Sequence, residues 1–273
     1  MRKPARLTRP PKLGQNFLND TAASRKIVDA LGDVSRSIVI EIGPGKGAMT
    51  RLLQERASKL IAIEYDRQLA AMLQLDFCGK NNIEIVQADI RDVDLRALLR
   101  GIDREEPVRV VGNLPYYITS DILLKLLGAS DLFTLIVVMV QKEVADRLAA
   151  SPGSRDYGLL SATAQMHGSV RKLFELPPTS FTPPPQVHSA VVEIRIAPRF
   201  PALGVDATGF DAFLKLAFAH KRKTIMNNLR AKYGEPLSRN ALEEADIKPA
   251  ARAESLTLEQ MAALYRQLSP AEG

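Results

Sequence analysis

Five short apolar runs, each rich in β-branched residues, recur along the first half of the chain. They cover residues 37–42, 59–64, 83–89, 107–113 and 132–140. Between them the apolar residues follow helical spacing, as at Met49, Leu52 and Leu53 after the first run. Strands that are apolar almost throughout and alternate with helices indicate a parallel sheet covered on both faces. The pattern therefore predicts a doubly wound α/β fold.

The pattern changes in the second half of the chain. After helical segments at 142–150 and 159–166, two further strand patterns, 172–176 and 189–196, flank the proline-rich stretch PPTSFTPPPQ. They predict an antiparallel hairpin at the sheet edge, which makes a mostly parallel sheet of seven strands.

Strand patterns end after residues 198–201, and about three helices follow. The last begins with Thr257 and Gln260 at capping-box spacing. We predict two domains, a sheet domain over 1–200 and a small all-helical domain over 201–273.

Basic residues are concentrated in two segments of a chain whose formal net charge is +6. The first twelve residues hold five Lys or Arg and no acid, and residues 211–233 hold six against one acid. We interpret 1–13 as a basic arm and 211–233 as a helix with an apolar stripe and an outer basic face. Both could bind a nucleic-acid backbone. The alternatives are a tail without function and an ordinary solvated face.

Other features of the composition exclude several classes of protein. No stretch has the roughly 20 consecutive apolar residues of a membrane span, so we expect no membrane role. The single cysteine, Cys78, excludes an internal disulfide and a zinc site of clustered cysteines, which suits the cytoplasm. We interpret Cys78 as inert packing and expect no metal.

A glycine-rich loop, EIGPGKGAMT, follows the first predicted strand. Gly43, Gly45 and Ala48 fit the G-x-G-x-x-A spacing that lets a backbone approach a ligand closely, whereas the P-loop spacing is absent. Glu64 ends the second strand, 21 residues after Gly43, where a carboxylate can accept hydrogen bonds from both ribose hydroxyls. Asp89 ends the third strand and could accept a hydrogen bond from an adenine amine. The pattern favours an adenosine cofactor, either NAD or S-adenosylmethionine. The alternatives are a tight turn for the glycines and helix caps for the acids.

The sequence NLPYY ends the fourth strand at the same sheet edge. Pro115 restricts Leu114 to extended geometry, so the Leu114 carbonyl and the Asn113 side-chain oxygen can both point outward. Tyr116 adds a flat ring beside these two acceptors. Together they fit a planar heterocycle with an NH2 group, such as adenine. The alternative is a turn with a buried tyrosine.

Two acceptors that hold an amine, here the Asn113 side-chain oxygen and the Leu114 carbonyl, can activate its nitrogen as a nucleophile. Accepting hydrogen bonds from both N–H groups favours a pyramidal nitrogen, whose lone pair can attack an electrophilic methyl group held in line. Alignment of this kind can be worth ~7 to 11 kcal/mol. Hydride transfer does not require two acceptors for an amine, so the sequence favours S-adenosylmethionine over NAD as the cofactor.

With these motifs the sequence resembles the ribosomal RNA adenine dimethyltransferases over nearly its whole length. The shared segments are GQNFL, EIGPGKGAMT, Glu64, QAD, NLPYY, FTPPPQVHSAVV, HKRKTIMNNL and RAESLTLEQ. The resemblance implies a Rossmann-like class I methyltransferase fold with S-adenosylmethionine as methyl donor. It is strongest to the bacterial enzymes that dimethylate two adjacent adenines near the 3′ end of 16S rRNA in the small ribosomal subunit. His188 departs from the family pattern, which more often has an acid there.

The resemblance also implies roles for individual residues. Asn16 and Leu18 would cover the cofactor, while Gly43, Gly45, Glu64, Asp89 and Asn113 would contact or border it. Tyr116 and Phe181 would sandwich the target adenine, although core packing is the alternative for Phe181. A stacked base cannot reach such a pocket, so the target must be unpaired or flipped.

Two other functions stay open beside a cytoplasmic, monomeric 16S rRNA dimethyltransferase. One is a ribosome-assembly factor in which binding is the main activity. The other is a 23S rRNA adenine methyltransferase of the macrolide-resistance type, which would share the catalytic core.

Overall fold

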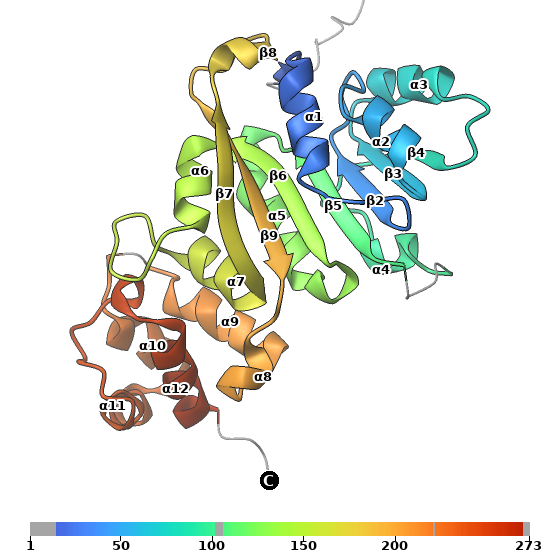
Figure 1. Ribbon diagram of the computed structural model, residues 1–273. Helices are drawn as coiled ribbons and strands as arrows, with labels where there is room; N and C mark the ends of the chain where they lie inside the picture. The colour runs from blue at the N-terminus through green and yellow to red at the C-terminus, as the bar shows by residue number, and fades with distance from the viewer. Residues whose placement is uncertain (1–14, 102–105, 221, 270–273) are drawn as a thin grey trace, which may run out of the picture.

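A seven-stranded mixed sheet forms the centre of the computed structural model, which describes residues 15–101, 106–220 and 222–269 (Figure 1). The strand order is β4-β3-β2-β5-β6-β9-β7. The parallel strands are β2 (Ile38–Ile42), β3 (Lys59–Glu64), β4 (Ile83–Gln87), β5 (Val108–Asn113) and β6 (Leu135–Gln141). This order and direction confirm the doubly wound α/β fold.

The antiparallel part of the sheet is the predicted hairpin. Strand β9 (Ser189–Ile196) pairs with β6 on one side and with β7 (Gly168–Leu176) on the other, so β7 is the edge strand. The connection between them includes β8 (Phe181–Thr182), which pairs with β1 (Phe17–Leu18) in a separate two-stranded sheet. Residues near the start of the described chain therefore lie against the proline-rich loop.

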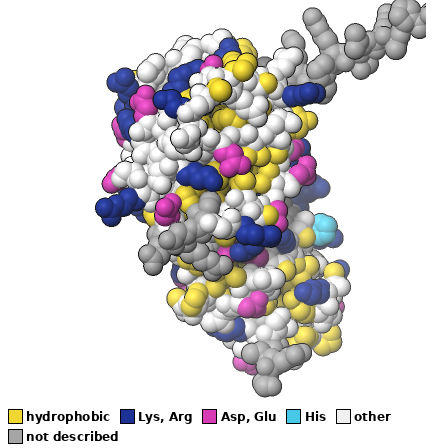
Figure 2. Space-filling model, turned by 90° about the vertical axis from the view of Figure 1, so that its right-hand side faces the viewer, with side chains coloured by type: hydrophobic (Ala, Val, Ile, Leu, Met, Phe, Trp, Pro, Cys, Tyr) yellow, Lys and Arg dark blue, Asp and Glu magenta, His cyan; other side chains and the backbone are white. Residues whose placement is uncertain are grey.

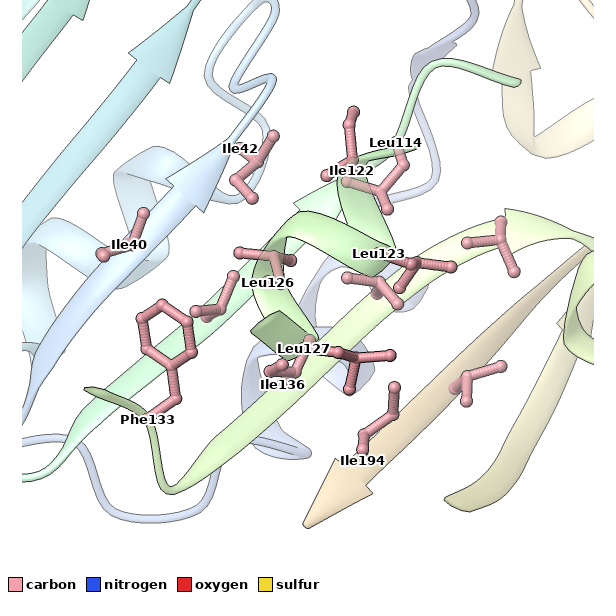
Figure 3. Close-up of a cluster of buried hydrophobic side chains, with 14 of the residues drawn as sticks. Ile40, Ile42, Leu114, Ile122, Leu123, Leu126, Leu127, Phe133, Ile136 and Ile194 are labelled. Carbon is pink, nitrogen blue, oxygen red and sulfur yellow. The ribbon is translucent and has the colours of Figure 1, made fainter. Parts of the chain in front are cut away.

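Successive strand residues enter two different cores, which explains the continuous apolar runs. Ile38, Ile40 and Ile42 of β2 join one core, and Val39 joins the other. The first core is filled by α4 (Leu95–Leu98), α5 (Thr119–Gly128), α6 (Lys142–Leu148) and α7 (Leu159–His167). Figure 3 shows Leu123, Leu126 and Leu127 of α5 packed over this face. The second core is filled by α1 (Thr21–Asp29) and α2 (Thr50–Arg56), with α3 (Arg67–Asp76) beside α2 (Figure 1).

The C-terminal region is helical and gathers at one end of the sheet (Figure 1). Its helices are α8 (Phe200–Leu203), α9 (Ala207–Ala217), α10 (Ile225–Tyr233), α11 (Glu235–Glu244) and α12 (Leu258–Leu268), more than the three or so expected. The capping box of Thr257 and Gln260 is present at α12. The apolar side chains of these helices pack in a third core, which also includes Tyr157, Ala162 and Met166. The domain boundary near residue 200 stays a prediction.

The prediction of a single helix over 211–233 is wrong, because the helical backbone is interrupted between the end of α9 and the start of α10. Asn228 donates its side-chain amide to the Ala217 carbonyl at 2.6 Å, which satisfies the end of α9. Thr224 then caps α10 by accepting from the Asn227 N–H. Most of the apolar stripe is buried as expected, at Phe210, Phe213, Leu214, Ala217, Ile225 and Leu229, whereas Phe218 is half-buried. Arg222, Lys223 and Arg230 are exposed.

Two other expectations concern residues away from the sheet. Cys78 is exposed in the turn after α3, so its interpretation as packing is wrong. The basic arm over 1–13 lies outside the described residues. Within the described ranges, none of the helices is long and apolar enough to cross a membrane.

Candidate active site

A cleft opens at the carboxyl ends of the four neighbouring strands β4, β3, β2 and β5. The empty space of the cleft, counted together with the open space at its mouth, is about 800 Å³. Its lining residues include Asn16, Phe17, Gly43, Gly45, Glu64, Tyr65, Asp89, Asn113, Leu114, Tyr116 and Tyr117. The structure thus brings together most of the residues singled out in the sequence. They meet because parallel strands place their carboxyl ends along one sheet edge.

The glycine loop lies close to its neighbours, so that a side chain on it would be both strained and crowded. Gly43 and Gly45 have φ angles of +66° and +57°, which favour glycine. A Cβ on Gly43 would lie 3.2 Å from the Asn113 carbonyl oxygen, and one on Gly45 would lie 3.0 Å from the Phe17 ring. The loop is therefore fixed between the end of β5 and the segment before α1.

Glu64 binds this loop from the end of β3. One carboxylate oxygen accepts the Gly45 N–H at 2.9 Å and the other accepts the Asp66 N–H at 2.8 Å. The side chain is almost fully buried, and burial raises the pKa of its carboxyl above the ordinary value, opposed by these backbone hydrogen bonds. Each oxygen keeps a second lone pair, so the carboxylate can also accept hydroxyl groups of a ligand.

Asp89 has a partner that sequence reasoning missed. The Arg91 guanidinium donates to both carboxylate oxygens, with the shortest contact at 2.6 Å, and the Arg91 backbone N–H donates to one of them at 2.9 Å. These hydrogen bonds hold the pKa of Asp89 below its ordinary value. Asp89 is therefore a fixed, charged acceptor at the cleft wall. The sequence showed Arg91 two residues away, but not its side-chain conformation.

Asn113 and Leu114 occupy the predicted position at the end of β5. The Asn113 side-chain nitrogen donates to the Asn16 carbonyl at 2.9 Å, which turns its oxygen to the other side. The Leu114 N–H donates to the Met139 carbonyl at 3.1 Å, and its side chain is buried in the sheet core. Pro115 has φ −59° and ψ 127°, the restricted geometry expected.

Two tyrosines follow with different environments. Tyr116 lines the cleft and is partly buried, which raises the pKa of its hydroxyl. That hydroxyl lies 2.6 Å from the Ser189 hydroxyl on β9. Tyr117 also lines the cleft but is 63% exposed, so its ring stands at the rim.

The residues before α1 divide between two hollows. Asn16 lines the cleft, as the resemblance implies, and Phe17 lies over Gly45 with the Lys46 ammonium 4.8 Å from its ring centre. Sequence reasoning did not single out Phe17. Leu18 is buried and lines a smaller hollow beside the glycine loop instead.

Phe181 lies outside the cleft lining in this structure. Its ring is 2% exposed and packs in the same core as Leu18, Ile27 and Met139. The sandwich with Tyr116 stays a prediction, and it requires the Phe181 ring to leave this core. Among the described residues, no cluster of three or more His, Cys, Asp or Glu could hold a metal ion.

The residues of the cleft fit S-adenosylmethionine. Glu64 and Asp89 are carboxylates at adjacent strand ends, where they could accept hydrogen bonds from a ribose and from an adenine amine. The side-chain-free Gly43 and Gly45 let the rest of the cofactor pass close to the backbone. The cofactor would then end beside Asn113, which borders Gly43.

Comparisons with known proteins agree with this geometry. The family model described as ribosomal RNA adenine dimethylase matches residues 7–269. Two similar proteins are named ribosomal RNA small subunit methyltransferase A. The one from Koribacter versatilis is 54% identical over 266 residues, which cover 94% of this chain and 93% of that protein. The one from Acidobacterium capsulatum is 53% identical over 259 residues, which cover 94% of this chain and 90% of that protein.

Two solved structures share the fold at 26% identity. A dimethyladenosine transferase from Plasmodium falciparum superposes with a TM-score of 0.74, covering 91% of this chain and 95% of the other. A 23S rRNA methyltransferase superposes with a TM-score of 0.66, covering 93% and 100%. With a family model that spans nearly all of its length and relatives above half identity, the chain belongs to the ribosomal RNA adenine dimethylase family.

Proposed function

We propose that the chain transfers methyl groups to the exocyclic amines of two adjacent adenines in a hairpin loop near the 3′ end of 16S rRNA, giving dimethyladenosines. S-adenosylmethionine supplies each methyl group as an electrophile on a sulfonium. The observation that carries the proposal is the convergence of Glu64, Asp89, Asn113 and Tyr116 on one cleft. The names of the similar small subunit methyltransferases support the choice of RNA.

Asn113 and Leu114 would hold the target amine. The Asn113 nitrogen is engaged by the Asn16 carbonyl, so its side-chain oxygen is the group left to accept one amine N–H. The Leu114 carbonyl would accept the other. These two hydrogen bonds favour a pyramidal nitrogen and direct its lone pair along the cleft, toward the cofactor side marked by Gly43 and Glu64. Holding the nitrogen and the methyl group in line in this way can lower the barrier by ~7 to 11 kcal/mol.

Tyr116 would hold the base by stacking on its ring. Base stacking on an aromatic side chain contributes ~1 to 3 kcal/mol per base and does not depend on sequence. After one transfer the amine keeps a single N–H, and one of the two acceptors then suffices. The same cleft can therefore serve both methylations.

The RNA backbone would be bound outside the cleft. We propose that residues 1–200 carry the chemistry and that 201–273, with the basic arm 1–13, contribute to binding the subunit. Arg222 and Lys223 are exposed between α9 and α10 and are suited to phosphates. On the face shown in Figure 2, Lys and Arg side chains are spread over the sheet part and the helical part, with acids between them. Since the proposed substrate is the small ribosomal subunit, we place this activity in the cytoplasm. We also expect the protein to be a monomer.

The 23S rRNA function is a second candidate, because a 23S rRNA methyltransferase shares the fold over 93% of this chain. One experiment separates the two. The protein is incubated with labelled S-adenosylmethionine and either undermethylated small subunits or large subunits, and the modified nucleotides are mapped. We expect dimethyladenosine at two adjacent positions near the 3′ end of 16S rRNA. Label in the large subunit alone would refute the proposal.

A substitution in the cleft separates catalysis from binding, and so tests the assembly-factor alternative. Asn113→Ala removes the amine acceptor and its bond to Asn16 without touching Arg222 or Lys223. We expect methyl transfer to be lost while binding to small subunits, measured by cosedimentation, persists. Loss of both activities would contradict the division between the cleft and the RNA-binding surfaces.

A further inference from the structure

Ser189 contacts Tyr116 through its side-chain hydroxyl. It is the first residue of β9 and is fully buried. Its backbone lies between Gln141 of β6 and Leu176 of β7, paired with both in register. Its hydroxyl lies 2.6 Å from the Tyr116 hydroxyl, across 73 residues of sequence. A side chain held by strands on both sides therefore reaches the far end of a ring that lines the cleft.

The other end of Tyr116 is fixed by the backbone. The Pro115 carbonyl accepts the Ile118 N–H at 3.3 Å and the Thr119 hydroxyl at 2.9 Å, which closes the single turn that begins at Tyr116. With the backbone and the hydroxyl both held, the two side-chain torsions of the tyrosine have little freedom. The ring plane is then set before any base arrives. A pre-set binding surface avoids the cost of ordering it on binding.

The same contact joins the two segments expected to hold the base. Tyr116 belongs to NLPYY, and Ser189 ends the loop that begins after Phe181 and Thr182 in β8. Ser189 is fully buried and does not line the cleft, so in this structure it acts on the cleft only through Tyr116.

We propose that Ser189 is a positioning residue, which fixes the Tyr116 ring for stacking on the target adenine through the hydrogen bond between their hydroxyls. This inference rests on the proposed function, because it assigns Tyr116 to the base. It predicts that loss of either hydroxyl slows methyl transfer without weakening cofactor binding. It also predicts a larger effect on the second transfer, in which the amine has one N–H left and depends more on stacking.

The test is a double-mutant cycle of Ser189→Ala and Tyr116→Phe, measured with undermethylated small subunits at saturating S-adenosylmethionine. Each single variant should lower the rate by about three- to tenfold, the typical effect of one lost hydrogen bond. The double variant should be no slower than either single one, since the same bond is lost. The ratio of monomethyl to dimethyl product should rise, and the cofactor Kd should change less than about twofold.

Ser130→Ala is the matched control. Ser130 is also buried, between α5 and β6 and outside the cleft, and its hydroxyl lies 2.7 Å from Nδ1 of His167. It should leave the rate and the product ratio unchanged. If Ser189→Ala fails to fold, Tyr116→Phe still removes the same bond while keeping the ring.

Two results would overturn the inference: multiplied losses in the double variant, or a Tyr116→Phe variant with the wild-type rate and product ratio. Neither touches the proposed function, which fails only if the wild-type protein itself forms no dimethyladenosine in 16S rRNA.

Discussion

The Glu64 carboxylate can be tested by the smallest possible change, Glu64→Gln, which keeps its size and removes one acceptor oxygen. In the structure each oxygen accepts a backbone N–H, from Gly45 at 2.9 Å and from Asp66 at 2.8 Å. A glutamine can satisfy only one of them with its oxygen. Its NH2 group would face the other N–H, and the glycine loop would lose either its support or its alignment with a ribose.

The magnitude follows from the hydrogen bonds removed. A hydrogen bond to a charged group contributes about 1.5 to 3 kcal/mol, and a buried N–H left without a partner costs a similar amount. The bonds to Gly45 and Asp66 exist with and without the cofactor, so the change in binding comes from the charged acceptor that the ribose loses, which we expect to be worth about 2 to 3 kcal/mol. At 1.4 kcal/mol per factor of ten, the Kd for S-adenosylmethionine should rise roughly 30- to 150-fold.

Isothermal titration calorimetry measures this Kd directly, with Asp66→Asn as the control. Asp66 lies two residues away and caps α3 by accepting the Gln68 and Leu69 N–H groups through one oxygen. Asparagine caps helices equally well, so the control should bind the cofactor within about twofold of wild type. A Glu64→Gln variant with wild-type affinity would refute the role of this carboxylate.

Three further predictions concern stability and RNA binding. Burial, together with the nearby Glu64 charge, raises the pKa of Glu41 to about 8, so the folded protein holds this proton more tightly than the unfolded chain. Wild type should therefore lose stability relative to Glu41→Gln as the pH rises from about 4.5 to 8, and a difference in melting temperature that stays constant over this range would contradict the assignment. The double variant Arg222→Ala and Lys223→Ala should weaken subunit binding and make the slope of log affinity against log salt concentration less steep by roughly 1.4 to 1.8. The Kd for the cofactor should not change. A slope equal to that of wild type would show that these residues lie outside the interface. Asn228→Ala should destabilise the protein by about 1 to 3 kcal/mol in urea unfolding, because the Ala217 carbonyl loses its buried donor, and wild-type stability would show that α9 ends without this contact.

Local patterns in the sequence were sufficient for the sheet and for most of the cleft. The apolar runs predicted the strands because both faces of the sheet are buried, as Ile40 and Val39 show by entering opposite cores. Since parallel strands end at one edge, the positions of Glu64, Asp89 and Asn113 followed from their places at strand ends.

Features that depend on contacts between distant residues were not predictable in this way. The break between α9 and α10 depends on Asn228 reaching back to Ala217, while the apolar stripe continues across the break and favours one helix. The Phe17 ring lies over Gly45 because β1 pairs with β8, which no local pattern indicates. The contact between Tyr116 and Ser189 likewise requires the folded sheet.

The central claim is that the Asn113 side-chain oxygen and the Leu114 carbonyl hold the target amine while Tyr116 stacks on its base. A crystal structure of the protein with a non-reactive cofactor analogue and an adenosine-containing RNA hairpin would test it most directly. We predict that the exocyclic nitrogen of the bound adenine lies at hydrogen-bond distance, about 2.7 to 3.2 Å, from both oxygens and faces the cofactor. An adenine bound elsewhere, or bound with its amine turned away from Asn113 and Leu114, would contradict this claim.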